Sequence, residues 1–162
     1  MQLPKYLKLI LSLLVPLSVG AVVGITTSDN ISTWFVNLKQ PWFAPPNWVF
    51  GPVWTCLYLL MGYAFYLIWV SSTYSHWKGK AITIFIIQLG LNFLWSYLFF
   101  AWHWLGLALF EICLLWVTIF LTILVFAKVS KLAAWLLVPY IIWVSFATIL
   151  AFVYWQLNTP NW

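Results

Sequence analysis

Five long apolar runs constrain this chain more than any other feature of its sequence. We expect them to form helices at residues 7–26, 50–71, 81–101, 105–127 and 132–157. A helix of about 20 apolar residues spans the roughly 30 Å hydrocarbon core of a bilayer. Because no water reaches that core, the backbone must pair its polar groups internally, as a helix does. The sequence therefore predicts an all-α integral membrane bundle of five transmembrane helices, in a single domain covering residues 1–162.

The composition supports membrane insertion. The chain is 65% hydrophobic and only 6% charged, whereas soluble domains carry about 25% charged residues. It has no arginine and so no planar fork for bidentate phosphate contacts, and we expect no nucleic-acid partner. Cys56 and Cys113 lie inside apolar runs, away from any metal-ligand spacing. We therefore expect no metal site and no disulfide.

The lysines indicate the orientation in the membrane. All but one lie at the N-terminus or in the loops after the second and fourth helices, namely Lys5, Lys8, Lys78, Lys80, Lys128 and Lys131. Lys39 lies on the other side, in the first loop. Because loops rich in lysine stay in the cytoplasm, we expect a cytoplasmic N-terminus. The first loop and the C-terminus would then lie on the opposite side.

One long connection, from Ser28 to Trp48, separates the first two helices. It contains Pro41, Pro45 and Pro46 among several aromatic residues. Proline fixes one backbone dihedral and removes a hydrogen-bond donor, so the segment should be stiff. We interpret it as a structured lid beside the bundle.

A polar stripe follows one face of the third predicted helix. Gln88, Asn92 and Ser96 are spaced four residues apart and share that face. Such groups either hydrogen-bond neighbouring helices, as is common in membrane bundles, or line a cavity and bond a ligand. Both interpretations remain open, and each can hold for a different residue.

Aromatic stripes mark the second and fifth helices. They comprise Trp54, Tyr58, Gly62 and Phe65 on the second, and Tyr140, Trp143, Ala147, Ala151 and Tyr154 on the fifth. Core packing and an interfacial aromatic belt are the plain explanations. Indole and phenol groups also combine a flat apolar surface with a single donor. Together with the polar stripe they would suit a flat, mainly apolar ligand.

Glu111 is the only acidic residue inside a predicted helix span. An intramembrane carboxylate is a functional hypothesis by default, but Glu111 can also serve as a structural anchor, for example by pairing with His103. No nucleophile, base and acid stand in a recognisable arrangement, and no glycine-rich phosphate loop is present. We assign no catalytic residue from these patterns.

Several segments resemble the TspO/MBR family, which comprises the tryptophan-rich sensory proteins and the translocator protein, or peripheral-type benzodiazepine receptor. In the first half they are Trp34-Phe35, Gln40-Pro41-x-Phe43-x-Pro45-Pro46, Phe50-x-Pro52-Val53-Trp54-Thr55 and Leu57-Tyr58-x2-Met61-Gly62. In the second half they are Gln88-Leu89-x-Leu91-Asn92-x2-Trp95-Ser96 and Pro139-Tyr140-x2-Trp143-Val144-x-Phe146-Ala147. The chain shows no mitochondrial transit segment, and we expect a bacterial member.

The resemblance implies a five-helix bundle, often a homodimer, whose pocket is closed by the first loop. It implies porphyrin or haem-like tetrapyrroles as ligands, together with isoquinoline and benzodiazepine compounds, and no obligatory cofactor. The ligand-binding residues carried over by motif are Phe35, Pro45, Trp54, Tyr58, Asn92, Trp95, Ser96, Trp143, Phe146 and Ala147. No basic residue follows Tyr154, so the C-terminal sterol motif of animal members is absent.

Three functions remain open at this point. The first is a membrane receptor or sensor that binds tetrapyrroles and regulates tetrapyrrole or stress responses. The second is light- and oxygen-dependent porphyrin degradation, with Trp54 and Trp143 as the reactive indoles that the resemblance implies. The third is transport of a porphyrin or sterol, although the chain lacks the internal repeat that many transporters show.

Overall fold

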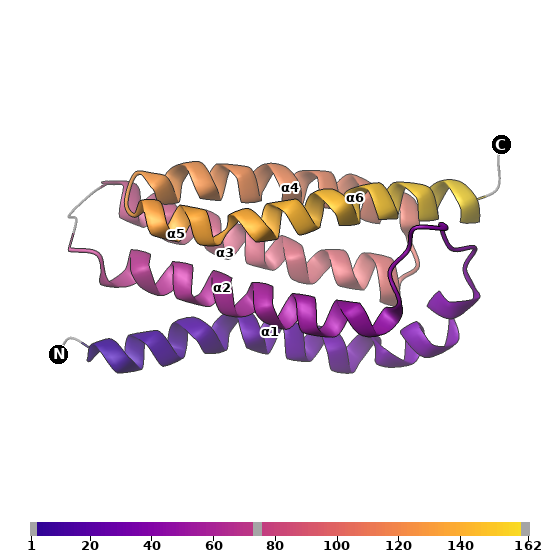
Figure 1. Cartoon of the computed structure of the whole chain (residues 1–162), viewed down its shortest axis with the longest axis horizontal. Coiled ribbons are helices and arrows are strands. Elements are labelled where there is room, and N and C mark those ends of the chain that lie inside the picture. The colour runs from indigo at the N-terminus through magenta and orange to yellow at the C-terminus, as the bar shows by residue number, and fades with distance from the viewer. Residues whose placement is uncertain (1–2, 73–75, 160–162) are drawn as a thin grey trace.

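Long helices run side by side through the computed structural model, which describes residues 3–72 and 76–159 (Figure 1). They are α1 (Lys5–Thr33), α2 (Phe50–Val70), α3 (His76–Ser96), α4 (Leu105–Ala127), α5 (Lys131–Leu136) and α6 (Val138–Asn158). Within the described residues, five spans are long and apolar enough to cross a membrane, and α5 and α6 together form the fifth. The predicted all-α membrane bundle is confirmed, while the predicted helix bounds need three corrections.

The first helix is longer than its apolar run. We predicted an end near residue 26, but α1 continues to Thr33. Hydroxyl groups in the added turns donate to carbonyls of their own helix, as from Thr27 to Val23 at 2.7 Å and from Ser32 to Asp29 at 3.0 Å. Because these polar residues satisfy themselves on the helix, it extends beyond the apolar stretch. The connection to α2 is therefore residues 34–49, and residues 34–48 are called the Pro/Trp loop below.

The third helix begins at His76, five residues before the predicted start, so Lys78 and Lys80 lie in its first turns and not in a loop. Near its other end the helix widens into a π-helical segment, η3 (Tyr97–Ala101). The Trp102 amide then donates to the Tyr97 carbonyl at 2.8 Å, and His103 adopts a left-handed conformation with φ of 59°. This left-handed residue turns the chain sharply into α4.

The fifth span is broken where we predicted one helix over residues 132–157. Helix α5 ends at Leu136 and α6 begins at Val138, with Pro139 in its first turn. Proline has no amide hydrogen and its ring displaces the carbonyl four residues earlier, so a continuous helix is disfavoured here. The Leu137 amide instead donates to the Ala134 carbonyl at 3.1 Å.

Helices α1 and α2 approach closely through two glycines. A Cβ atom at Gly62 would lie 2.7 Å from the Ser12 carbonyl oxygen and 2.8 Å from the Leu13 Cα. A Cβ atom at Gly20 would overlap the ring of Tyr58. At both positions only glycine leaves room for the facing helix.

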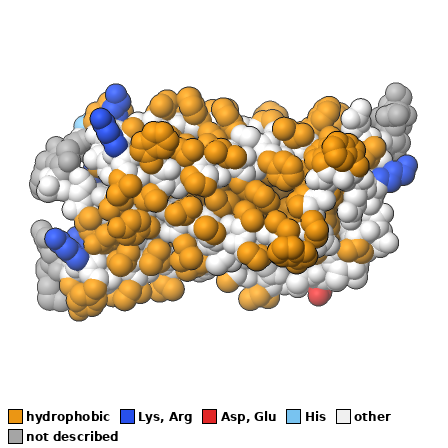
Figure 2. All heavy atoms as spheres, viewed as in Figure 1, with side chains coloured by type: hydrophobic (Ala, Val, Ile, Leu, Met, Phe, Trp, Pro, Cys, Tyr) orange, Lys and Arg blue, Asp and Glu red, His pale blue; other side chains and the backbone are white. Residues whose placement is uncertain are grey.

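Hydrophobic side chains cover most of the face of the bundle seen in Figure 2, and the visible lysines lie at its two ends. Six lysines belong to the end that holds the N-terminus, because they lie at the start of α1, α3 and α5 and at the end of α4. The Pro/Trp loop and the C-terminus lie at the other end (Figure 1). The protein is thus an integral, multi-pass membrane protein associated with the lipid bilayer, while its orientation stays a prediction.

Candidate functional site

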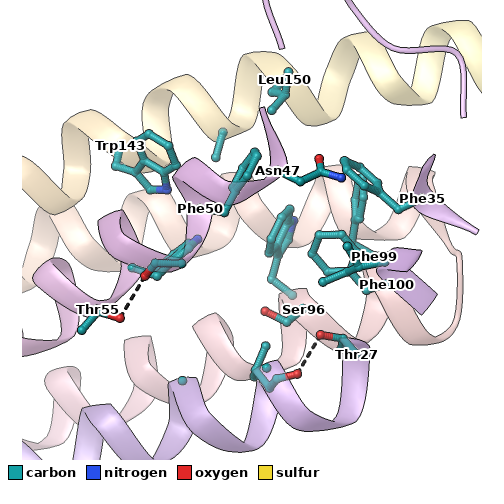
Figure 3. Close-up of a pocket in the computed structure, with 18 of the residues that line it drawn as sticks. Thr27, Phe35, Asn47, Phe50, Thr55, Ser96, Phe99, Phe100, Trp143 and Leu150 are labelled. Atoms are coloured by element: carbon teal, nitrogen blue, oxygen red, sulfur yellow. Dashed lines mark hydrogen bonds between the residues drawn. The ribbon is translucent and has the colours of Figure 1, made fainter. Parts of the chain in front are cut away.

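A cavity of about 300 Å³ opens among α1, α2, α3 and α6, on the side of the bundle next to the Pro/Trp loop. Aromatic residues dominate its wall. Phe35, Phe99 and Phe100 gather at one end of the cavity, and Trp143 stands toward the other (Figure 3). Ligand pockets are typically about 300–1,000 Å³, mostly apolar, with a few polar groups. By size and lining this cavity suits a small ring compound.

Seven of the ten residues that the resemblance implied line this cavity. They are Phe35, Trp54, Tyr58, Trp95, Ser96, Trp143 and Ala147. The other three lie outside the lining. Phe146 packs on Phe43 with ring centroids 6.4 Å apart, and Pro45 lies half-buried in the Pro/Trp loop. Asn92 lies behind the cavity wall.

Asn92 links three helices instead of facing the cavity. The Tyr58 hydroxyl of α2 donates to the Asn92 Oδ1 at 2.8 Å, and the Asn92 amide donates to the Tyr140 hydroxyl of α6 at 3.1 Å. All three residues are buried. Of the polar stripe, Asn92 therefore has the interhelical role, and Ser96, one turn further on, lines the cavity. The ring of Tyr58 lines the cavity while its hydroxyl points to Asn92.

Two indole groups of the lining have unused donors. The Nε1 atoms of Trp95 and Trp143 are buried and have no hydrogen-bond partner within the described chain. A buried donor left without a partner costs about 1–3 kcal/mol. Both residues line the cavity, so the two unpartnered donors lie close to its lumen.

The Pro/Trp loop is fastened to the bundle at several points. The Lys39 amide donates to the Asn158 Oδ1 at 2.8 Å, and the Asn158 amide donates back to the Lys39 carbonyl at 3.0 Å. Trp34 stacks on His103 with ring centroids 4.0 Å apart and planes inclined by 16°. The loop is therefore docked against α6 and against the turn before α4.

The sequence patterns missed the contribution of α1. Its residues on the cavity wall are Leu17, Gly20, Val23, Gly24, Thr27 and Ile31. Most are small or aliphatic, so they are indistinguishable in sequence from lipid-facing residues. Their spacing of three, four and seven residues was the one available signal, because it places them on a single helical face. Asn47, Phe50, Gly51, Thr55, Phe99, Phe100, Leu150, Ala151 and Tyr154 complete the lining.

Glu111 does not pair with His103, as one interpretation of the sequence suggested. Its side chain is buried on α4, and neither carboxyl oxygen has a hydrogen-bond partner in the described part of the protein. His103 instead stacks on Trp34. Glu111 is not part of the cavity lining.

The fold and the cavity define a multi-pass membrane protein with an internal aromatic chamber. A model of the TspO/MBR family matches residues 12–156, and the chain belongs to this family. It is 41% identical to the tryptophan-rich protein TspO of Archaeoglobus fulgidus over 152 residues, which cover 94% of this chain and 97% of that relative. The human translocator protein is 38% identical over 128 residues, or 77% of this chain and 75% of the relative.

A bacterial relative is similar as well. The tryptophan-rich sensory protein of Cereibacter sphaeroides is 35% identical over 125 residues, which cover 77% of each chain. These relatives support a general function for this chain. The chain is a membrane receptor or sensor of the TspO/MBR family.

Proposed function

We propose that the cavity binds a flat, mainly apolar ligand that carries hydrogen-bond acceptors, and that a tetrapyrrole such as protoporphyrin is a ligand of this kind. The observation that carries the proposal is the pair of unpartnered indole donors, Trp95 Nε1 and Trp143 Nε1, in the wall of an aromatic cavity. The aromatic rings offer stacking surface, and the two donors orient the ligand.

Stacking surface is available on two sides of the cavity. Trp54 and Tyr58 lie side by side on α2, with ring centroids 5.5 Å apart. On α3 and η3, Trp95 stacks on Phe99, with centroids 5.3 Å apart and planes inclined by 28°. A planar ring system between these pairs would contact an aromatic face on each side. A tetrapyrrole needs more room than the cavity of about 300 Å³ provides, so part of it would extend beyond the cavity.

Quenching of tryptophan fluorescence by protoporphyrin in detergent tests this function. We expect saturable quenching by the wild-type protein and a dissociation constant at least about tenfold higher for the double variant Trp54→Ala, Trp143→Ala, because it loses stacking surface and a donor. Trp135→Ala is the matched control, since Trp135 is 71% exposed and outside the cavity. Non-saturable quenching, or equal affinity in the double variant, would contradict the proposal.

A second candidate function is light- and oxygen-dependent breakdown of a bound porphyrin, with dioxygen as the oxidant. The observation in its favour is that Trp54 and Trp143, the indoles implied by the resemblance, both line the cavity. Illumination of the protein with protoporphyrin in air tests it by pigment absorbance. Pigment loss should be slower with Trp143→Phe than with the wild type, and equal loss would exclude a role for this indole.

A further inference from the structure

Exposed lining residues of the cavity lie on α1 and on α2. Gly24 on α1, and Gly51 and Thr55 on α2, belong to this lining and are exposed. The lining residues contributed by α6 are buried or half-buried. A Cβ atom built at Gly24 or at Gly51 would meet no atom within 4 Å. The space beside both glycines is therefore empty. We call this stretch between α1 and α2 the seam.

The neighbouring seams are closed by side chains. Between α2 and α6, Phe50 packs on Trp143 with ring centroids 5.8 Å apart. Toward η3, the Tyr97 hydroxyl donates to the Thr26 Oγ1 at 2.9 Å and ties α1 to the bundle. Further down the α1–α2 seam, Gly20 lies directly against the ring of Tyr58. The part of the seam that no side chain closes is thus limited to the surroundings of Gly24 and Gly51.

This stretch lies within the membrane-spanning part of α1. Gly24 precedes Asp29 by five residues, which is roughly 7–8 Å along a helix. The hydroxyls near the seam are satisfied on their own helices, since Thr55 donates to the Gly51 carbonyl at 2.9 Å and Thr27 to the Val23 carbonyl at 2.7 Å (Figure 3). The rim is therefore compatible with lipid chains and offers no unsatisfied hydroxyl to water.

The Pro/Trp loop, by contrast, is held by the reciprocal hydrogen bonds between Lys39 and Asn158 and by the Trp34–His103 stack. We propose that the ligand is a membrane-dissolved molecule that reaches the cavity sideways from the bilayer, between α1 and α2 at Gly24 and Gly51. The loop stays docked as a roof during this passage. This inference rests on the proposed function, because it requires the cavity to bind a ligand.

Stopped-flow quenching by protoporphyrin, with the protein in lipid nanodiscs, tests the route. A phenylalanine at the rim obstructs passage in both directions, so Gly24→Phe should slow association by about tenfold and slow dissociation as well, whereas a mere loss of affinity would speed dissociation. Gly51→Phe, on the other side of the seam, should do the same. Ala21→Phe is the matched control, because Ala21 lies on the exposed face of α1 outside the cavity lining.

The variant Asn158→Ala distinguishes ligand entry through the seam from entry past the Pro/Trp loop. If ligands pass through the seam, releasing the loop leaves both rate constants within about twofold of the wild type. Faster exchange in Asn158→Ala, or unchanged rates in both rim variants beside saturable wild-type binding, would overturn the lateral route alone. An absence of saturable binding by the wild type would overturn the proposed function and this inference with it.

Discussion

The hydroxyl of Tyr58 donates to the side-chain oxygen of Asn92 at 2.8 Å, between α2 and α3 and within the bundle core. The Asn92 amide in turn donates to Tyr140 on α6. Three of the four helices that surround the cavity are thereby joined behind its wall. These two hydrogen bonds lie outside the cavity, so a ligand does not compete for them. We therefore expect them to fix the positions of the three helices whether or not a ligand is bound.

Tyr58→Phe should therefore destabilise the protein. The variant leaves the Asn92 Oδ1 without its donor inside the core, which costs about 1–3 kcal/mol. We expect a lower midpoint of thermal unfolding in detergent, measured by tryptophan fluorescence. Tyr63→Phe is the control, because Tyr63 is 41% exposed and should melt like the wild type. Equal midpoints for all three proteins would show that the link contributes no stability.

Gly62→Ala should separate α1 from α2. Its Cβ would press on the backbone of Ser12 and Leu13, which cannot rotate away as a side chain could. Overpacking of this kind costs about 1–3 kcal/mol, so we expect a lower melting temperature. Gly79→Ala meets no atom within 4 Å and should be neutral or stabilising. A variant at Gly62 that melts like the wild type would contradict the close backbone contact.

Asn158→Ala should loosen the Pro/Trp loop without unfolding the bundle. The variant removes the acceptor for the Lys39 amide and the donor to the Lys39 carbonyl. We expect hydrogen exchange of peptides covering Lys39 to accelerate at least about tenfold, since each net hydrogen bond contributes about 1 kcal/mol. Gln156→Ala, an exposed position on the same helix, should leave exchange unchanged. Equal exchange in both variants would mean that other contacts hold the loop.

Glu111→Gln should fold at least as well as the wild type. Neither carboxyl oxygen of Glu111 accepts a hydrogen bond in the described chain, and a charge inside a membrane helix costs up to about 3 kcal/mol on insertion scales. The amide never carries that charge and loses no bond. We expect an unchanged or higher melting temperature, with Asp29→Asn as the exposed acidic control. A drop of several degrees for Glu111→Gln alone would show that the carboxyl group has a structural partner.

The sequence predicted the bundle well because membrane insertion depends on hydrophobicity along the chain. Helix α4 has the bounds that we predicted, 105–127. The predicted helix bounds were wrong where the apolar run and the helix do not coincide. The hydroxyl-rich end of α1 is polar yet helical, and the apolar fifth span is interrupted near Pro139.

The candidate site was only partly predictable. Trp54, Trp95 and Trp143 line the cavity as the resemblance implied, whereas Asn92 bonds Tyr58 and Tyr140. Spacing places Asn92 and Ser96 on the same helical face and cannot tell which of them a tyrosine will cover. The wall of α1 gave no distinct signal, since most of its lining residues are small or aliphatic, as lipid-facing residues are. The homodimer and the cytoplasmic N-terminus stay predictions.

The central claim is that the indole donors of Trp95 and Trp143 recognise an acceptor on a flat ligand. It is tested most directly by the dissociation constants of an isoquinoline carboxamide and of its analogue in which a methylene replaces the carbonyl. We predict that the wild type prefers the carbonyl compound by about tenfold and that Trp95→Phe, Trp143→Phe removes the preference, because it deletes the donors and keeps aromatic surface. An equal preference in the wild type and in the double variant would contradict the account.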